Sequence, residues 1–350
     1  MHQRLNNFRS RFKHHIIDAY IVTKSVNIKY LTRFDAEDSW LLITKTKAFY
    51  ITDSRYTLAA KKGLKGISVQ EYKESFYKTV FELAKRQKIK RLGFDENHFT
   101  VAQFNALKKV CPRSVKLIAA NHLVEHLREI KDAKEISAIK KALKIHAQAL
   151  KYLKKIIRPG KTERDILHAL ESFVRDKNVT FSFDPIIASG PNGAFPHASI
   201  TGRKVGQNDV VLVDFGIDVE GYKSDLTRMF FLGKISNLIG RVNDSVAQSQ
   251  LEAIAIIKDG VAAAQVDAAA RNYLAKNDLE KYFGHSLGHG VGLEIHENPR
   301  LSSKTKSVLR AGMVVTVEPG VYWPGKFGVR IEDMVLVTKK GCEVLSGDID

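Results

Sequence analysis

Three histidines and two glutamates lie among glycines in the segment GHSLGHGVGLEIHENP, residues 284–299. The histidines are His285, His289 and His296. Imidazoles bind transition metals and exchange protons near neutral pH, so this segment could belong to a metal site or to acid–base catalysis. The four glycines argue against a helix, because each interior glycine costs about 1 kcal/mol relative to alanine. We expect irregular strand and turn presenting imidazoles to a site, with ordinary loop histidines as the alternative.

Four carboxylates follow apolar runs or lie within strand-like segments elsewhere in the chain. They are Asp214 in VVLVDFG, Asp225 in YKSDLTR, Glu318 in VVTVEPG and Glu332 in VRIEDM. Acidic side chains are seldom buried without a partner. Each one could form a structural ion pair, with Arg228 or Arg330 as candidate partner, or it could bind a cation. Taken together with one imidazole, the four carboxylates make an oxygen-rich site that suits two divalent metals such as Mn, Co, Fe or Zn.

The spacing of Asp214 and Asp225 gives a geometric prediction. They are eleven residues apart, across an expected hairpin that turns at residues 218–221. If the turn pivots on Val219 and Glu220, the two aspartates face each other directly, with Cβ atoms about 4.5–5.5 Å apart. A three-residue pivot would place them on opposite faces of the sheet. Two bare carboxylates so close repel each other, and one keeps a proton unless a cation intervenes.

The elements that must position these residues form two groups. Over the first 120 or so residues, AYIVTK, WLLITKTKAFYITD and RLGFD have strand patterns, the second with a hairpin turn near residues 45–47. YTLAAKKG and ESFYKTVFELAKRQK have helical patterns, with Phe76, Val80, Leu83 and Ala84 at helical spacing. The alternation of strands and helices predicts a small α/β domain.

The rest of the chain begins with a long charged helix in DAKEISAIKKALKIHAQALKYLKKII, which ends before Pro159 and Gly160. Thr162 is a candidate N-cap for a second helix. Past residue 180 the chain is rich in strand patterns, interrupted by one helical stretch at roughly residues 240–280. No internal repeat is evident, although strand pairs separated by helices occur twice. We therefore place a domain boundary near residues 122–132, which gives domains at residues 1–125 and 126–350.

The composition is that of a globular protein. The chain has 350 residues, of which 44% are hydrophobic and 27% charged. No apolar run approaches the ~18 residues that a membrane helix needs, and the basic N-terminal segment lacks the apolar region of a secretory signal. Cys111 and Cys342 match no metal-binding spacing. We expect a cytoplasmic protein without a membrane partner.

The net charge of +18 is concentrated in the first part of the chain. Residues 1–130 carry 25 Lys and Arg against 12 Asp and Glu, whereas residues 131–350 carry 31 against 26. A basic half can indicate a polyanionic partner. Here the basic residues lie on expected helix faces without interleaved aromatic side chains, so we interpret them as solvated surface and expect no nucleic-acid partner.

Several long motifs occur in a characteristic order: FDPIIASGPNGAFPHA, VVLVDFG, YKSDLTRMFF, GHSLGHGVGLEIHENPRLS, GMVVTVEPGVYWPG and GVRIEDMVLVT. In this respect residues 130–350 closely resemble the pita-bread metallopeptidases, specifically the branch of Xaa-Pro aminopeptidases and prolidases (Xaa-Pro dipeptidases). The first domain resembles the creatinase-type N-terminal domain through NIKYLTRF and YITDSRY. The resemblance implies a creatinase-type α/β domain followed by a duplicated α+β catalytic domain with a curved antiparallel sheet.

The resemblance also implies roles for individual residues. The metal ligands would be Asp214, Asp225, His289, Glu318 and Glu332, called the candidate ligands below. Glu318 would in addition accept a proton. His197, His285 and His296 would face the substrate, with His197 and His296 among the catalytic residues. Arg330 would orient a ligand carboxylate, and Arg300 would engage a peptide carboxylate unless it is an ordinary surface arginine.

The implied activity is hydrolysis of the bond between an N-terminal residue and a following proline, as in an Xaa-Pro aminopeptidase. It would use two divalent ions per chain, with Mn first and Co, Zn or Fe as alternatives, and a homodimer is expected. The alternatives are an Xaa-Pro dipeptidase and a metal-free binding protein on the same scaffold. A methionine aminopeptidase-like enzyme is disfavoured by the N-terminal domain and by the two-histidine segment GHSLGHG.

Overall fold

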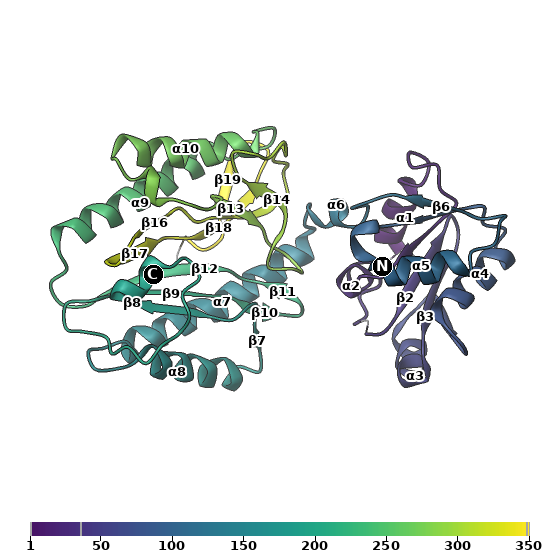
Figure 1. Cartoon of the computed structure of the whole chain (residues 1–350), viewed down its shortest axis with the longest axis horizontal. Coiled ribbons are helices and arrows are strands. Elements are labelled where there is room, and N and C mark those ends of the chain that lie inside the picture. Colours follow the sequence, from purple (N-terminus) through teal and green to yellow (C-terminus); the bar gives the residue numbers. More distant parts are fainter. Residues whose placement is uncertain (1, 36, 348, 350) are drawn as a thin grey trace. The chain divides into compact units, whose positions relative to one another are not determined.

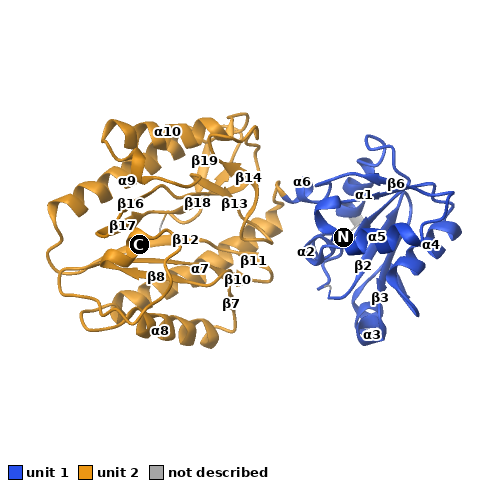
Figure 2. Ribbon diagram, viewed as in Figure 1, with its two compact units in different colours: residues 1–128 blue, residues 129–350 orange. Residues whose placement is uncertain are grey.

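The computed structural model describes residues 2–35, 37–347 and 349, with only the backbone described for His2. The chain forms two compact units, residues 1–128 and residues 129–350 (Figure 2). Within the described residues, no helix combines the length and the apolar composition that crossing a membrane requires.

Unit 1 is built on a six-stranded mixed sheet with the order β4-β3-β2-β1-β5-β6. The pairs β1–β2 and β2–β3 are antiparallel, and the other pairs are parallel. The strands are β1 Ala19–Val22, β2 Trp40–Thr44, β3 Ala48–Thr52, β4 Ser68–Glu71, β5 Arg91–Phe94 and β6 Lys116–Ala119. Strands β1 to β3 are buried on both faces, which explains their continuous apolar sequences. The hairpin predicted near residues 45–47 is confirmed.

Helices cover this sheet. They are α1 His2–Ser10, α2 Ser25–Thr32, α3 Ser54–Gly63, α4 Phe76–Arg86, η1 Glu96–His98, α5 Val101–Lys109 and α6 Glu125–Arg128. On α4, the predicted stripe packs into the core through Val80, Leu83 and Ala84, while Phe76 stacks on Trp40 with ring centroids 5.1 Å apart. The α/β character predicted for this part of the chain is confirmed.

The described residues of unit 2 form four long helices, which lie on two sides of the strands in Figure 1. Helices α7 Ala133–Ile156 and α8 Glu163–Asp176 lie on one side, and α9 Asn237–Ala255 and α10 Ala263–Lys276 lie on the other. Thr162 is the N-cap of α8, as predicted, and forms a capping box with Asp165. The single helical stretch predicted at residues 240–280 is wrong, because Gly260 adopts a φ of +89° and separates two helices.

The strands of unit 2 pair only in antiparallel fashion within the described residues. They form sheets with the orders β12-β9-β8, β14-β13-β15-β18-β19, β11-β10-β7 and β16-β17. The strands are β7 Thr180–Phe181, β8 Ile186–Ser189, β9 Val210–Phe215, β10 Ile217–Val219, β11 Tyr222–Lys223, β12 Leu226–Phe231, β13 Gly288–Gly290, β14 Glu297–Leu301, β15 Val314–Val317, β16 Gly320–Trp323, β17 Phe327–Arg330, β18 Asp333–Val337 and β19 Cys342–Val344. Two short 3₁₀ helices complete the unit, η2 Gly190–Ala194 and η3 Glu280–Tyr282.

The two halves of unit 2 repeat one arrangement of a helix pair followed by strands. Gly160 and Gly260 precede α8 and α10 with the same φ of +89°. Thr162 and Ala262 are the N-caps of these helices, and each forms an isolated antiparallel bridge with a later segment. The repeat escaped sequence inspection because the two halves share a pattern of burial more than identical side chains. The duplicated α+β fold implied by the resemblance is confirmed.

Candidate metal centre and active site

Asp214 and Asp225 come from one antiparallel strand pair, β9 and β12. The register places Thr227 directly opposite Asp214, so the prediction that Asp225 faces Asp214 is wrong. The reason lies in the turn, where Glu220 and Gly221 both adopt positive φ and form the two-residue hairpin loop. This moves the partner of Asp214 by two residues. Because side chains alternate with a period of two, the two aspartates still project from one face.

A glycine lets the chain bend at Asp225. Gly216 lies between β9 and β10, and a Cβ atom there would collide with the carbonyl oxygen of Ser224. The Ser224 hydroxyl accepts a hydrogen bond from the backbone N–H of Ile217 at 2.9 Å. The hairpin therefore passes from one sheet to the next at this point, and Asp225 lies at the change, just before β12.

His289 belongs to the short strand β13, so the irregular strand expected from the glycine-rich segment is confirmed. Its neighbour Gly288 runs so close to the Thr316 carbonyl that a side chain would not fit. The ring Nδ1 lies 3.1 Å from the carbonyl oxygen of Gly290, to which it can donate its proton. Nε2 is then left as the acceptor that a metal ligand requires.

The Nε2 atom of His289 faces two carboxylates. It lies 3.3 Å from Oε1 of Glu318 and 3.5 Å from Oδ2 of Asp225. Although burial opposes both shifts, this pairing lowers the pKa of Glu318 to about 2 and raises the pKa of His289.

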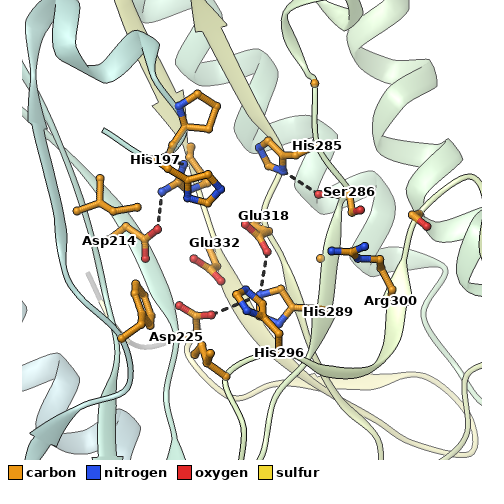
Figure 3. A pocket seen from close by; sticks show the side chains of 18 of the residues that line it. His197, Asp214, Asp225, His285, Ser286, His289, His296, Arg300, Glu318 and Glu332 are labelled. Atoms are coloured by element: carbon orange, nitrogen blue, oxygen red, sulfur yellow. Dashed lines mark hydrogen bonds and ion pairs between the residues drawn. The ribbon is translucent and has the colours of Figure 1, made fainter. Parts of the chain in front are cut away.

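All five candidate ligands converge, as Figure 3 shows. Asp225, His289 and Glu332 offer ligand atoms that lie within 4.8 Å of one another. Asp214 and Glu318 line the same cavity. Residues more than 100 positions apart in the sequence thus form one cluster, with Asp214 and Asp225 from the first half of unit 2 and the other three from the second.

The cluster carries more negative charge than its own cations balance. Burial, reinforced by neighbouring carboxylates, raises the pKa of Asp225 and Glu332 well above the usual range. Burial also raises the pKa of Asp214, against the opposing effect of the Arg330 guanidinium. A bound cation would supply the missing positive charge and remove the need for protons on these groups.

The hydrogen bonds of two of these carboxylates are also consistent with a bound cation. Asp214 Oδ2 accepts from Arg330, and Glu332 Oε2 accepts from the Thr227 hydroxyl at 2.8 Å. The other oxygens, Asp214 Oδ1 and Glu332 Oε1, are buried and have no hydrogen-bond partner among the residues described. Each carboxylate is thus held on one oxygen and offers the second, which is how metal-binding carboxylates are oriented.

Arg330 organises this part of the site. Its guanidinium donates to Asp214, to the Thr227 hydroxyl at 2.9 Å, to the Tyr322 hydroxyl at 2.7 Å and to the Pro196 carbonyl at 3.2 Å. The other candidate ion-pair partner, Arg228, instead pairs with Asp333. Sequence reasoning missed Thr227 and Tyr322. Thr227 could have been suspected, because it lies two residues after Asp225 on the same strand face.

The remaining predicted residues line a cavity of about 1310 Å³ that contains the candidate ligands. His197, His285, His296 and Arg300 all contribute to its wall. Arg300 lies directly opposite His289 in the β13–β14 pair, so both side chains project from the same face.

The three histidines of this wall differ in their surroundings. His285 is partly buried, and its Nε2 lies 2.9 Å from the Tyr322 hydroxyl. Burial lowers the pKa of His285 and of His296. The His296 ring lies against His289 with centroids 4.3 Å apart, and the His197 side chain is exposed.

A second group of ligand-type residues lies in unit 1 and consists of Asp95, His98 and Glu125. Glu125 Oε1 lies 2.7 Å from His98 Nε2 and accepts from Asn27 Nδ2 at 2.6 Å. Asp95 Oδ2 accepts from the backbone N–H of His122 at 2.7 Å. Because these atoms already have partners, we interpret the group as a hydrogen-bonded network within unit 1.

Comparison with known families identifies the two parts of the chain. The pattern of the metallopeptidase family M24 matches residues 137–339, which include all candidate ligands. The chain belongs to metallopeptidase family M24. Residues 4–130 match the creatinase/prolidase N-terminal domain. The resemblance seen in the sequence is thereby confirmed, together with the fold and the hydrolase class that it implied.

Individual relatives align over nearly the whole chain. An uncharacterized peptidase, YqhT of Bacillus subtilis, is 36% identical and covers 97% of this chain and 96% of its own. The structure of an Xaa-Pro dipeptidase from Bacillus anthracis has a TM-score of 0.95 at 36% identity, with 99% and 97% of the two chains covered. That of an X-Pro aminopeptidase from Thermotoga maritima has a TM-score of 0.88 at 34% identity, with 96% and 97% covered.

Proposed function

We propose that this chain is a two-metal exopeptidase that cleaves the bond between an N-terminal residue and a following proline. One observation carries the proposal: Asp214 and Glu332 each direct one buried, unpartnered oxygen into the cluster formed by the described candidate ligands. The names of the relatives, Xaa-Pro dipeptidase and X-Pro aminopeptidase, support the specificity.

The candidate ligands would hold the two divalent ions, with Mn first among Mn, Co, Zn and Fe. When bound, such a pair supplies an activated water and charge stabilisation at the scissile carbonyl. Glu318 is placed to take the water proton, because Thr316 and His289 hold its carboxylate in the site. His296, beside His289 on the open side, would donate a hydrogen bond to the substrate carbonyl as negative charge develops there.

The other residues would bind and orient the peptide. His197 and His285 would form the wall against which the proline ring packs. The Xaa-Pro bond is a tertiary amide without an N–H, so this wall need not supply an acceptor there. Arg300 would pair with a peptide carboxylate, and Arg330 would keep Asp214 oriented.

The size of the cavity favours an aminopeptidase. Its volume of about 1310 Å³ exceeds the range of ~300–1,000 Å³ typical of small-ligand pockets, which leaves room for residues beyond the proline. A strict dipeptidase is the second candidate, supported by the very close likeness to the Bacillus anthracis Xaa-Pro dipeptidase.

The test compares purified protein with and without added divalent metal on Xaa-Pro and Xaa-Pro-Xaa peptides. We expect about two ions per chain and kcat/KM values on the tripeptides at least as high as on the dipeptides. Asp225→Asn should lose nearly all activity, whereas Asp218→Asn in the same hairpin, where Asp218 pairs with Lys223, should not. Cleavage of dipeptides alone would favour the dipeptidase. A protein that binds no metal ions and cleaves neither kind of peptide would favour the metal-free binding-protein alternative.

The homodimer, the cytoplasmic location and the assignment of residues 1–125 and 126–350 as domains stay predictions from the sequence.

The basic surface of the N-terminal part is tested by heparin chromatography. We expect elution at low salt, because a solvated surface lacks the multiple phosphate-type contacts that produce a steep salt dependence.

A further inference from the structure

The loop of residues 189–201 forms part of the cavity wall. It leaves β8 at Ser189, passes through η2 and carries Pro196 and His197 to the rim of the cavity. His197 is exposed there, as is the neighbouring Phe195. A loop that carries a substrate-facing side chain needs anchors elsewhere, because ordering flexible backbone on binding would weaken affinity.

A single buried carboxylate anchors both ends of this loop. Glu163, the first residue of α8, is fully buried. It accepts hydrogen bonds from the Ser189 N–H at 2.7 Å and hydroxyl at 2.8 Å, and from the Asn192 amide at 3.0 Å. At the far end it accepts from the Thr201 N–H at 2.9 Å and hydroxyl at 2.6 Å. Burial raises its pKa, but these bonds outweigh that effect and lower it.

Further contacts fix the stem and the tip of the loop. The N–H of Glu163 donates to the Arg203 carbonyl at 3.2 Å, and Arg203 donates to the Ser189 hydroxyl at 2.7 Å. Near the tip, the Pro196 carbonyl accepts from Arg330, the same guanidinium that holds Asp214. The residue directly after Pro196 is His197, so the loop anchored by Glu163 is also tied to the metal centre.

We propose that Glu163 is a positioning residue that sets the place of His197 at the cavity. This proposal rests on the substrate-facing role proposed for His197. The ionised carboxylate is essential to it, since every loop group that Glu163 contacts is a donor. A glutamine would offer one oxygen in place of two and would direct an N–H₂ group at those donors.

The second half of unit 2 holds its own histidine segment by a related arrangement. Asp267 on α10 is fully buried and accepts from Arg271 and from the N–H of Leu287 at 3.1 Å. Arg271 in turn donates to the carbonyl oxygens of Phe283 and His285. In both halves, therefore, a buried carboxylate on the second helix fixes the segment that carries a cavity-lining histidine.

The experiment compares Glu163→Gln with Asp165→Asn, a matched control in the same helical turn. Asp165 is exposed, and its hydrogen bonds are confined to Thr162 among the described residues. For Glu163→Gln on an Xaa-Pro-Xaa peptide we expect a rise in KM of about tenfold with a much smaller change in kcat. Hydrogen exchange should become faster in residues 189–201, while metal content stays unchanged. Unaltered exchange in that loop would overturn the proposal.

A double-mutant cycle separates positioning from general destabilisation. If Glu163 acts through His197, Glu163→Gln with His197→Ala should bind substrate no more weakly than His197→Ala alone. Additive losses would contradict the proposal. If His197→Ala by itself leaves KM unchanged, the role proposed for His197 fails, and the exchange measurement still decides whether Glu163 holds the loop. Should Glu163→Gln not fold, Thr201→Val removes one donor at similar volume and should change exchange and KM in the same direction.

Discussion

At the scale of single residues, the candidate metal centre depends on the two oxygens of each carboxylate, of which one accepts a hydrogen bond and the other is left to bind a cation. Arg330 holds one oxygen of Asp214, and Thr227 holds one oxygen of Glu332. The second oxygen of each stays available in the cluster. The four acidic candidate ligands are recognisable in the sequence because acids within apolar strands are rare, whereas Thr227 and Tyr322 have residue types that strands commonly contain.

Replacing Arg330 tests this orientation. In Arg330→Lys a single ammonium cannot reach the four acceptors that the guanidinium contacts. We expect metal affinity to fall about 10–100-fold, with a comparable loss of kcat/KM at limiting metal. Titration calorimetry with Mn²⁺ measures the affinity. Arg310→Lys, whose guanidinium pairs with Asp259 outside the described cavity lining, serves as the control and should retain affinity; an equal loss in both variants would contradict the orienting role.

At the scale of elements, periodicity and breaking residues in the sequence predicted much of the arrangement. The N-cap at Thr162 and the N-terminal hairpin were found because their signals are local. The register of β9 with β12 was not predicted correctly. A one-residue error in the position of the turn's centre shifts the partner of every residue in the strand pair by two positions. The duplication was implied by the family resemblance but was not visible as a repeat in the residues, because the two halves share burial and backbone angles more than identical side chains.

The close approach at Gly216 gives a prediction for the β9–β12 hairpin. Gly216→Ala would drive a methyl group into the Ser224 carbonyl, so we expect a loss of about 1–3 kcal/mol in the free energy of unfolding. Gly240→Ala is the control, because this glycine lies within α9 with open space around it, and alanine there should stabilise by about 0.5–1 kcal/mol. Urea unfolding monitored by circular dichroism measures both. Equal effects of the two substitutions would contradict the packing described for Gly216.

At the scale of the whole molecule, each unit has its own buried core, and unit 1 has its own partly buried charged groups. Glu125 is the clearest case. Burial alone would raise its pKa, but hydrogen bonds from His98 and Asn27 lower it to about 2, against an ordinary value of 4.5. The ionised form therefore stabilises the folded state.

This shift predicts a dependence of unit 1 stability on pH. Because the pKa is lower in the folded state, the contribution of Glu125 is complete above about pH 4.5 and is lost as the pH falls toward 2. We expect it to be on the order of 2 kcal/mol. The difference in unfolding free energy between wild type and Glu125→Gln should shrink over that interval. Glu96→Gln, at an exposed position on η1, is the control; a difference that stays constant with pH would refute the assignment.

The duplication of unit 2 has a consequence for its thermal behaviour. Since the candidate ligands come from both halves, bound ions would add cross-links between segments that lie far apart in the sequence. Chelation by EDTA should then lower the melting temperature of unit 2, with a loss of about 2.7 kcal/mol for each ion from a starting metal concentration 100 times its dissociation constant. Scanning calorimetry should show the effect in that transition alone, since the cross-links lie outside unit 1.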